Sequence, residues 1–230
     1  MEDQFKVLPI FPRFFSKEDN IHLCRDISLQ ELEDILKSCA KEKSSGPNGW
    51  TVEFFLGFWD LVGPDVLNMV MESRREGRIS GTLNSTFIAL IPKSSKPASY
   101  DDFHPISLCN FIYKIISKVI AYQIKPYLSA VITGEQFGFL PDRQILDAVG
   151  ITQKGIHSIK TKKIPAVLLK MDLIKAYDRI DWVFLRLILL HVGLDGELVR
   201  WIMACVCNVH FIVLVNDAPT SFFQSQRGLR

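Results

Sequence analysis

Apolar side chains recur at two different spacings along the chain, and these predict helices and strands in different segments. Over Leu29–Leu36 they return every three or four positions, which is the period of a helix that buries one face. Ser28 and Glu31 have the spacing of a capping box, so this helix is expected to begin after Ser28 and end near Ala40. Pro64 suits the first turn of a later helix. Further helices are predicted over residues 50–59, 64–75, 112–125, 145–160, 182–191 and 197–207.

Shorter and nearly unbroken apolar runs predict strands. Thr86–Lys93 is one such run, in which Pro92 ends the predicted strand and Lys93 is placed at the edge of the predicted sheet. Ala166–Met171 follows a proline and is interpreted as a buried strand. A hairpin is expected from 210–215 and 221–226, and the segments together predict an α/β (α+β), helix-rich fold. The expected core positions are Leu90, Ile116, Leu168, Leu169, Trp182, Leu185 and Trp201.

Composition narrows the class of protein. The chain has 230 residues, of which 48% are hydrophobic, so it can bury a sizeable core. Its net charge of +2 is not that of a polycation, so any nucleic-acid surface must come from local basic patches. Five scattered cysteines without a zinc-site pattern indicate reduced thiols in an intracellular protein, nuclear or cytoplasmic. The acidic N-terminus is unlike a secretory signal, and no apolar run approaches the ~20 residues that a membrane helix needs.

Asp172 directly follows the predicted strand Ala166–Met171, and two interpretations of it are open. A carboxylate at the end of a rigid strand is suited to Mg²⁺, which prefers hard oxygen ligands and keeps substrate phosphates in its shell. Asp is equally common as the cap of a following helical turn.

Basic residues in two other segments also allow two interpretations each. The loop Lys43–Gly49 is either a turn between helices or a cradle of free backbone N–H groups for an anion. Lys114 and Lys118 project from the predicted helix 112–125, either as a solvated face or as a phosphate track.

The stretch Met171–Trp182 resembles the first catalytic motif of reverse transcriptases, in the form found in plant LINE-type (non-LTR) retrotransposons. The resemblance implies that Asp172 is a catalytic, metal-binding aspartate and that the carbonyl of Leu173 lies beside it. It also implies that Tyr177 is the aromatic gate under the sugar of the incoming nucleotide. We interpret Lys175, Asp178 and Trp182 as structural: a salt-linked turn and a packing anchor.

Other segments resemble motifs of the same family in the expected order. Ser44–Gly49 matches a Ser-Ser-Gly-Pro-Asp-Gly motif, with Asn48 retaining the turn chemistry of the usual Asp. Lys93 and His104 match positions of the fingers that grip the nucleotide, although His replaces the usual Arg. These matches are carried by Leu90–Lys93, Phe103–Leu108 and Gly134–Asp147.

The last of these segments contains two informative positions. Asp142 replaces a Gly at a position that needs φ > 0, which Asp tolerates better than most residues. Arg143 is either a template or primer phosphate contact or the partner of Asp147 in an ion pair.

Irregularly spaced aromatic residues and prolines indicate a loosely ordered N-terminal arm over residues 1–27. The resemblance covers the rest and implies a fingers-like region (28–164) and the first part of a palm (165–230). It implies an RNA-directed DNA polymerase that uses an RNA template, a DNA primer, dNTPs and Mg²⁺. The family's aromatic-x-Asp-Asp motif does not follow Asp172 in this sequence, since its only adjacent aspartates are Asp101 and Asp102. We therefore expect a truncated portion that is inactive alone, the alternative being a non-catalytic nucleic-acid-binding remnant or an unselected relic. An incomplete palm is also expected to expose a sheet edge that favours self-association.

Overall fold

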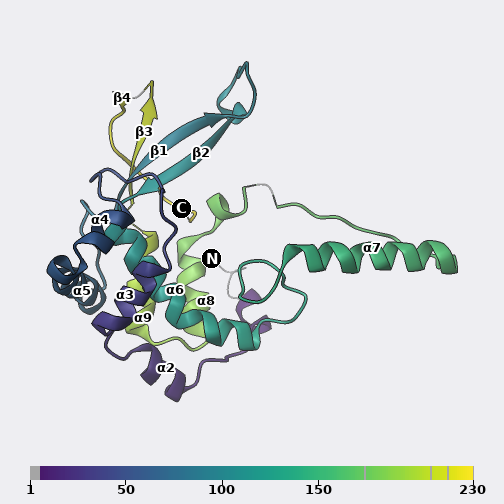
Figure 1. The fold of residues 1–230 in the computed structure, drawn as a ribbon. Helices are drawn as coiled ribbons and strands as arrows, with labels where there is room; N and C mark the ends of the chain where they lie inside the picture. The colour runs from purple at the N-terminus through teal and green to yellow at the C-terminus, as the bar shows by residue number, and fades with distance from the viewer. Residues whose placement is uncertain (1–5, 174, 208, 217, 230) are drawn as a thin grey trace.

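Figure 1 shows the computed structural model as a helical body with a small sheet at one end and one long helix that projects away. The structure describes residues 6–173, 175–207, 209–216 and 218–229. The helices are α2 (Lys17–Leu23), α3 (Leu29–Lys37), α4 (Val52–Gly57), α5 (Trp59–Glu76), α6 (Phe111–Val131), α7 (Ile145–Lys162), α8 (Trp182–His191) and α9 (Gly196–Val206). Short 3₁₀ helices are η1 (Leu8–Ile10), η2 (Tyr100–Asp102) and η3 (Tyr177–Arg179). The predicted α/β class is confirmed.

The sheet joins strands from distant parts of the chain. Its strands are β1 (Ser85–Pro92), β2 (Phe103–Cys109), β3 (His210–Val215), β4 (Ala218–Pro219) and β5 (Phe223–Gln224). β1 pairs with β2 in antiparallel fashion and with β3 in parallel, while β4 and β5 both pair with β3. The predicted C-terminal hairpin is therefore present, with its return strand divided in two. The 28–164 and 165–230 regions share this sheet.

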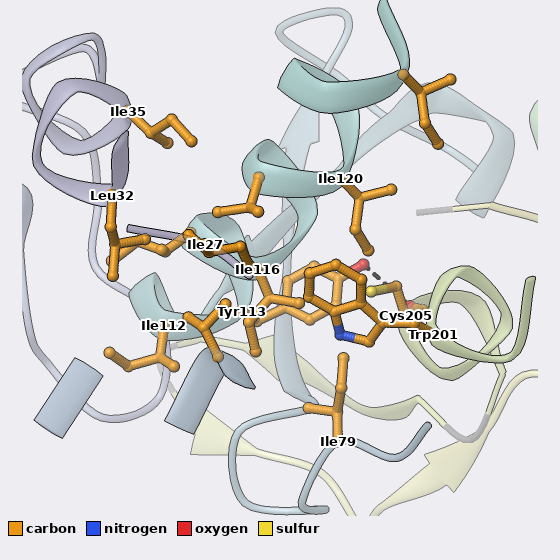
Figure 2. Packing of buried hydrophobic residues seen from close by; sticks show 14 of the residues in the cluster. Ile27, Leu32, Ile35, Ile79, Ile112, Tyr113, Ile116, Ile120, Trp201 and Cys205 are labelled. Carbon is orange, nitrogen blue, oxygen red and sulfur yellow. Dashed lines mark hydrogen bonds between the residues drawn. The ribbon is translucent and has the colours of Figure 1, made fainter. Parts of the chain in front are cut away.

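The core is organised around α6, the predicted helix with an isoleucine-rich face. α3 and α9 pack against α6, and α5 packs against both α3 and α9. Ile116 and Trp201 are fully buried, as expected (Figure 2). The Tyr113 hydroxyl donates a 3.0 Å hydrogen bond to the carbonyl oxygen of Cys205, so α6 is tied to α9 by a polar contact inside the apolar cluster.

The N-terminal region contributes to this core. Phe15, Leu23 and Ile27 are buried within it, and Ser16 forms a complete capping box at the start of α2. The Ser28 hydroxyl accepts a hydrogen bond from the Glu31 N–H, which confirms the predicted start of α3.

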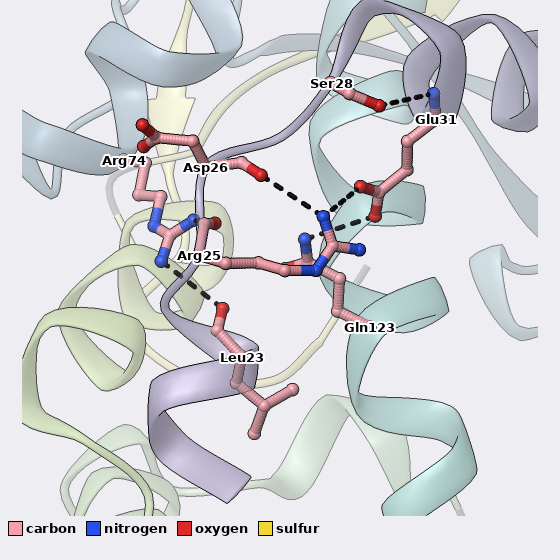
Figure 3. Close-up of polar contacts among 7 residues, drawn as sticks. All are labelled: Leu23, Arg25, Asp26, Ser28, Glu31, Arg74 and Gln123. Carbon is pink, nitrogen blue, oxygen red and sulfur yellow. Dashed lines mark hydrogen bonds and ion pairs between the residues drawn. The ribbon is translucent and has the colours of Figure 1, made fainter. Parts of the chain in front are cut away.

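Figure 3 shows the polar contacts that connect this region to the rest of the body. The Arg74 guanidinium is buried and donates to the carbonyl oxygens of Leu23 and Arg25 at 3.3 and 2.6 Å. Arg25 in turn forms a 2.7 Å ion pair with Glu31, to which the Gln123 amide donates. α2, α3, α5 and α6 are thereby linked through these side-chain contacts.

The predicted buried strand Ala166–Met171 is wrong in this structure. The segment has no regular secondary structure, and the exposed fractions of Leu168 and Leu169 are 68% and 76%. A buried strand needs neighbours for its backbone N–H and C=O groups, and β1 is already flanked by β2 and β3. Among the described residues, none of the strands pairs with 166–171, and its apolar side chains are exposed to solvent.

Smaller differences concern other predicted elements. Leu90, Trp182 and Leu185 are only partly buried, and Pro64 lies inside α5 beyond its first turn because the helix already begins at Trp59. β2 was not predicted as a strand. In the part of the chain that the structure describes, no helix is long and apolar enough to cross a membrane.

Candidate functional site

The largest cavity near the predicted motif residues is a cleft of about 840 Å³ that we call the Tyr177 cleft. Tyr177 and Phe139 form one wall, with ring centroids 6.1 Å apart in an edge-to-face arrangement. The other walls come from the sheet and from the segment Ser225–Leu229. The sheet residues that line the cleft include Ile88, Pro105, Ser107, Phe211 and Phe223.

Backbone contacts hold the segment Ser225–Leu229 against the motif that contains Tyr177. Leu229 N–H donates to the Tyr177 carbonyl at 2.9 Å, and Gly228 N–H donates to the Ile180 carbonyl at 2.8 Å. Gly228 has φ +87°, and a Cβ there would lie 2.9 Å from the Asp178 Cα, so the close approach requires glycine. The Trp182 indole N–H donates to the Gly228 carbonyl at 2.7 Å, which confirms Trp182 as a packing anchor.

Phe139 reaches the cleft from an unusual backbone conformation. Its φ is +68°, and Asp142 nearby has φ +59°, which confirms the predicted positive φ at Asp142. Sequence reasoning missed Phe139 as a wall of the cleft. The only signal was an aromatic residue in a motif otherwise made of turn residues.

Arg143 follows this turn and does not form the ion pair with Asp147 that was one of its two predicted roles. Its guanidinium donates to the carbonyl oxygens at the C-terminal end of α6 and just beyond it: Ser129, Ile132, Thr133 and Gln136. A helix C-terminus has unpaired carbonyls and a partial negative charge, both of which favour a cation there. Arg143 therefore caps the C-terminal end of α6, and its role as a phosphate contact stays a prediction.

The tip of the β1–β2 hairpin brings Lys93 close to the central motif. Lys93 Nζ donates to the backbone carbonyl of Asp101 at 2.6 Å, and Lys175 Nζ lies 3.3 Å from the Asp101 carboxylate. The ion pair of Lys175 thus joins the motif to the β1–β2 hairpin through Asp101, and does not close a turn within the motif as predicted. Backbone N–H groups of Ala98 and Ser99 hold the pKa of the neighbouring Asp102 carboxyl below its usual range.

His104 lies in β2 opposite Ile91, on the sheet face away from the Tyr177 cleft. Side chains alternate along a strand, and Pro105 and Ser107 line the cleft, so His104 points to the other side together with Ile106. Its side chain is exposed. The structure therefore does not bring the predicted nucleotide ligand His104 into the cleft.

Asp172 and Leu173 are exposed and do not line the cleft. The next residue, Ile174, lies outside the described residues. Mg²⁺ in phosphoryl-transfer enzymes needs carboxylates from separate segments, but the described chain contains no cluster of three or more His, Cys, Asp or Glu side chains arranged to hold a metal. The residues described therefore do not fit a two-metal centre.

A second cavity, of about 550 Å³, gathers the predicted phosphate track; we call it the lysine cavity. Lys114 and Lys118 from α6 line it together with Lys43 and the half-exposed Trp50, both from the loop between α3 and α4. The two α6 ammonium groups make only long contacts, of 3.3 and 3.4 Å, with the backbone carbonyls of Ser44 and Ser38. Positive charges beside an exposed indole suit a single-stranded nucleic acid.

Asn110 positions the loop that carries Lys43. Its buried side chain accepts from the Asn48 N–H at 3.0 Å and donates to the Thr82 carbonyl at 2.8 Å. Gly46 lies so close that a Cβ would be 2.4 Å from the Asn110 backbone nitrogen. The Asn48 side chain accepts from the Trp50 N–H, which confirms the predicted turn chemistry. Asn110 was missed as a site residue, its only signal being a polar residue before an apolar helix.

Comparison with known proteins places these features in a family. The model of the family described as "Reverse transcriptase (RNA-dependent DNA polymerase)" matches residues 91–230. The chain belongs to the reverse transcriptase family. The matched part of this reverse transcriptase chain includes the Tyr177 motif, β2, α6 and Arg143. The chain is also similar to "Transposon TX1 uncharacterized 149 kDa protein" of Xenopus laevis, with 29% identity over 204 residues. The aligned part is 89% of this chain and 16% of that protein, so the chain spans about one sixth of the relative's length.

Proposed function

We propose that this chain is the fingers and first part of the palm of an RNA-directed DNA polymerase from a plant-type LINE (non-LTR) retrotransposon, acting inside the cell. The observation that carries the proposal is the Tyr177 cleft. Its aromatic wall lies on a motif that the sequence relates to the nucleotide site of reverse transcriptases, and it faces the β1–β2 hairpin. The similarity to a transposon protein supports the retroelement origin.

In this proposal the Tyr177 cleft receives the base and sugar of a dNTP. The Tyr177 ring is half exposed, so it offers an apolar face to a sugar that lacks a 2′-hydroxyl, and a 2′-hydroxyl would be left without a hydrogen-bond partner against the ring. Lys93 and Lys175, held at the hairpin tip by Asp101, supply positive charge for the phosphates. The Leu173 carbonyl and His104 remain nucleotide contacts only by resemblance.

The lysine cavity is proposed to hold the RNA template. Lys43, Lys114 and Lys118 carry full positive charge without a carboxylate among the lining residues, and Trp50 offers a stacking face for a base. A DNA primer would then lie between this cavity and the Tyr177 cleft. Binding through lysines of this kind falls steeply as salt is raised.

Asp172 is proposed as one carboxylate of a Mg²⁺ site that this set of residues does not complete. A single exposed carboxylate competes poorly with water for Mg²⁺, which dehydrates reluctantly. We therefore propose that the 230-residue chain binds nucleotides and RNA but does not polymerise by itself. The alternative, a non-catalytic binding remnant, is favoured by the exposure of Asp172.

The decisive experiment compares nucleotide binding to the chain with and without the Tyr177 ring. Saturation-transfer NMR with dNTP and rNTP should show preferential contact of dNTP, and Tyr177→Ala should abolish the preference. Tyr122→Ala, which removes an equally exposed ring on α6, is the control. Equal binding of dNTP and rNTP to the unaltered chain would contradict the proposed role of the cleft.

Primer extension tests whether the chain polymerises by itself. We expect no metal-dependent nucleotide incorporation by the chain alone. If incorporation occurs and Asp172→Ala abolishes it, the chain is a complete catalyst, and both the proposal that it does not polymerise by itself and the binding-only alternative are wrong.

The template proposal has its own test. Binding of single-stranded RNA, measured by fluorescence anisotropy at several salt concentrations, should weaken in Lys114→Gln/Lys118→Gln. The control Lys154→Gln/Lys160→Gln removes the same charge from α7, and equal loss in both variants would show that the lysine cavity has no special role.

Self-association is proposed to involve apolar surface more than the sheet edge. The exposed run Val167–Met171 and exposed side chains on α7, such as Ile145 and Leu146, offer a contact for a second chain. Light scattering after size-exclusion chromatography should give a smaller mass for Leu168→Ser/Leu169→Ser than for the unaltered chain.

A further inference from the structure

A third cavity, of about 480 Å³, lies on the opposite side of the sheet from the Tyr177 cleft. The pairing of β3 with β5 shows this separation directly. His210 is paired with Gln224, and both line the third cavity, whereas the adjacent pair Phe211 and Phe223 lines the Tyr177 cleft. Since successive residues of a strand point to opposite faces, the two cavities are on different faces of the same ladder.

Three arginines from separate segments converge on this cavity, which we call the arginine cavity. Arg78 follows α5, Arg186 is on α8 and Arg200 is on α9. All three are exposed, and none forms an ion pair among the residues that the structure describes. Like charges gathered around one space repel one another unless an anion lies between them.

The other lining residues supply no negative charge to balance the arginines. No Asp or Glu lines the arginine cavity, although Glu72 and Glu76 line an adjoining one that Arg78 also borders. Burial raises the pKa of the Cys207 thiol, so that sulfur is neutral. Glu197, on the helix of Arg200, is already paired with Arg74. The positive charge of the cavity is therefore not compensated by its own walls.

His210 and Gln224, which both line the cavity, are joined by a side-chain hydrogen bond. The Gln224 amide nitrogen lies 2.8 Å from His210 Nε2, and because an amide nitrogen only donates, Nε2 accepts. The other ring nitrogen, Nδ1, is buried and has no hydrogen-bond partner among the described residues. The cavity is thus lined by three arginines, His210 and the Gln224 amide, without an acidic side chain, and this lining favours an acceptor-rich ligand.

We propose that Arg78, Arg186 and Arg200 form a phosphate-binding site on the sheet face opposite the Tyr177 cleft. Guanidinium groups match phosphate oxygens in bidentate geometry, which lysines do not, and the volume accommodates a phosphate group with its ester substituents. The phosphate belongs either to a nucleic-acid backbone that passes behind the sheet or to a free anion. The site does not depend on the function proposed for the Tyr177 cleft.

The test uses the full chain, the variant Arg78→Gln/Arg186→Gln/Arg200→Gln and the charge-matched control Lys154→Gln/Lys160→Gln/Lys162→Gln on α7. Inorganic phosphate is titrated by calorimetry, and single-stranded RNA is titrated by anisotropy over a range of salt. All three arginines are exposed, so the variant is expected to fold, which circular dichroism checks.

Loss of phosphate binding in the arginine variant alone, with an unchanged RNA salt dependence, assigns the site to a free anion. A fall of up to about 2 in the slope of log affinity against log salt for RNA, with the control unchanged, assigns it to a nucleic-acid backbone. If the arginine variant and the control respond alike to both probes, the site is refuted.

A variant that keeps the positive charges shows whether phosphate binding depends on the geometry of the arginine side chains or on net charge alone. Arg78→Lys/Arg186→Lys/Arg200→Lys keeps all three charges but loses the bidentate geometry, so phosphate affinity should fall about tenfold or more. Phosphate binding equal to that of the unaltered chain would show that only net charge matters and would overturn the assigned site.

Discussion

The body around α6 and the projecting part of the chain both contain apolar side chains, but these are buried in the body and exposed in the projecting part. In the body, Ile116 and Trp201 are fully buried between helices. α7 projects away from the body (Figure 1), and no residue along it is buried. The apolar run Val167–Met171 that follows is exposed. The difference shows that an apolar pattern determines what a segment can bury, while burial itself requires a partner with a matching face.

The same contrast divides the motif residues. Tyr177 and Trp182 are held by hydrogen bonds to the segment Ser225–Leu229, so their positions are defined from two sides. Asp172 lies only a few residues earlier, yet its segment lacks regular structure and its side chain is exposed. Tyr177 and Trp182 are therefore fixed by contacts with a distant segment, whereas the predicted metal ligand Asp172 lies in a segment without regular secondary structure.

Among the variants that test the contrast between the buried body and the exposed segments, the largest loss of stability is expected for a substitution of Trp201. Trp201→Ala removes a fully buried ring, its 3.0 Å hydrogen bond to the Ser73 hydroxyl and its contact with the Arg74 guanidinium. The free energy of unfolding should fall by about 3–5 kcal/mol, measured by urea denaturation. Leu169→Ala is the control, and because that side chain is exposed its effect should stay within about 0.5 kcal/mol.

Asn110 should have the next largest effect, because it joins the lysine cavity to the body. Asn110→Ala leaves the Asn48 N–H and the Thr82 carbonyl without their partner, at a cost of about 1–3 kcal/mol in unfolding free energy. RNA binding through Lys43 should weaken as well. Unchanged stability in urea denaturation would show that the loop does not depend on this side chain.

A substitution of Arg143, which lies between α6 and α7, tests whether this residue stabilises the structure. Arg143→Gln removes charge-assisted hydrogen bonds to carbonyl oxygens at and just beyond the end of α6, and the free energy of unfolding should fall by about 1–2 kcal/mol. Amide hydrogen exchange should increase in the last turn of α6. Lys154→Gln on α7 should leave both measurements unchanged; an RNA-binding defect without a stability change in Arg143→Gln would instead indicate a phosphate contact.

The smallest effect concerns Asp102 in the β1–β2 hairpin. Its pKa is lowered by the N–H groups of Ala98 and Ser99, so its contribution to stability is present above the unfolded-state pKa and is lost as pH falls through the lower folded-state pKa. An NMR pH titration should show the hairpin loop loosening only in strongly acidic solution. Asp102→Asn should remove this dependence, whereas Asp26→Asn should leave it intact.

Features of the site that depend on residues close together in the sequence could be predicted, and features that depend on distant residues could not. The positive φ of Asp142 and the turn chemistry of Asn48 were predictable because both depend on a few neighbouring residues. The position of Phe139 in the Tyr177 cleft was not, since its partner Tyr177 is distant in sequence. His104 failed for another reason: its face of the sheet is set by the register of β1 with β2, and β2 was not predicted.

The sequence by itself determined α3 with its Ser28 cap, the isoleucine-rich face of α6 and the family motifs, because periodic burial and capping hydrogen bonds are local properties. Only the tertiary structure decided that the run before Asp172 stays exposed and that Arg143 closes α6. It alone also brought Arg78, Arg186 and Arg200 around one cavity. Strand pairing, capping by a distant side chain and convergence of charges all depend on which surfaces meet, and no local spacing encodes that.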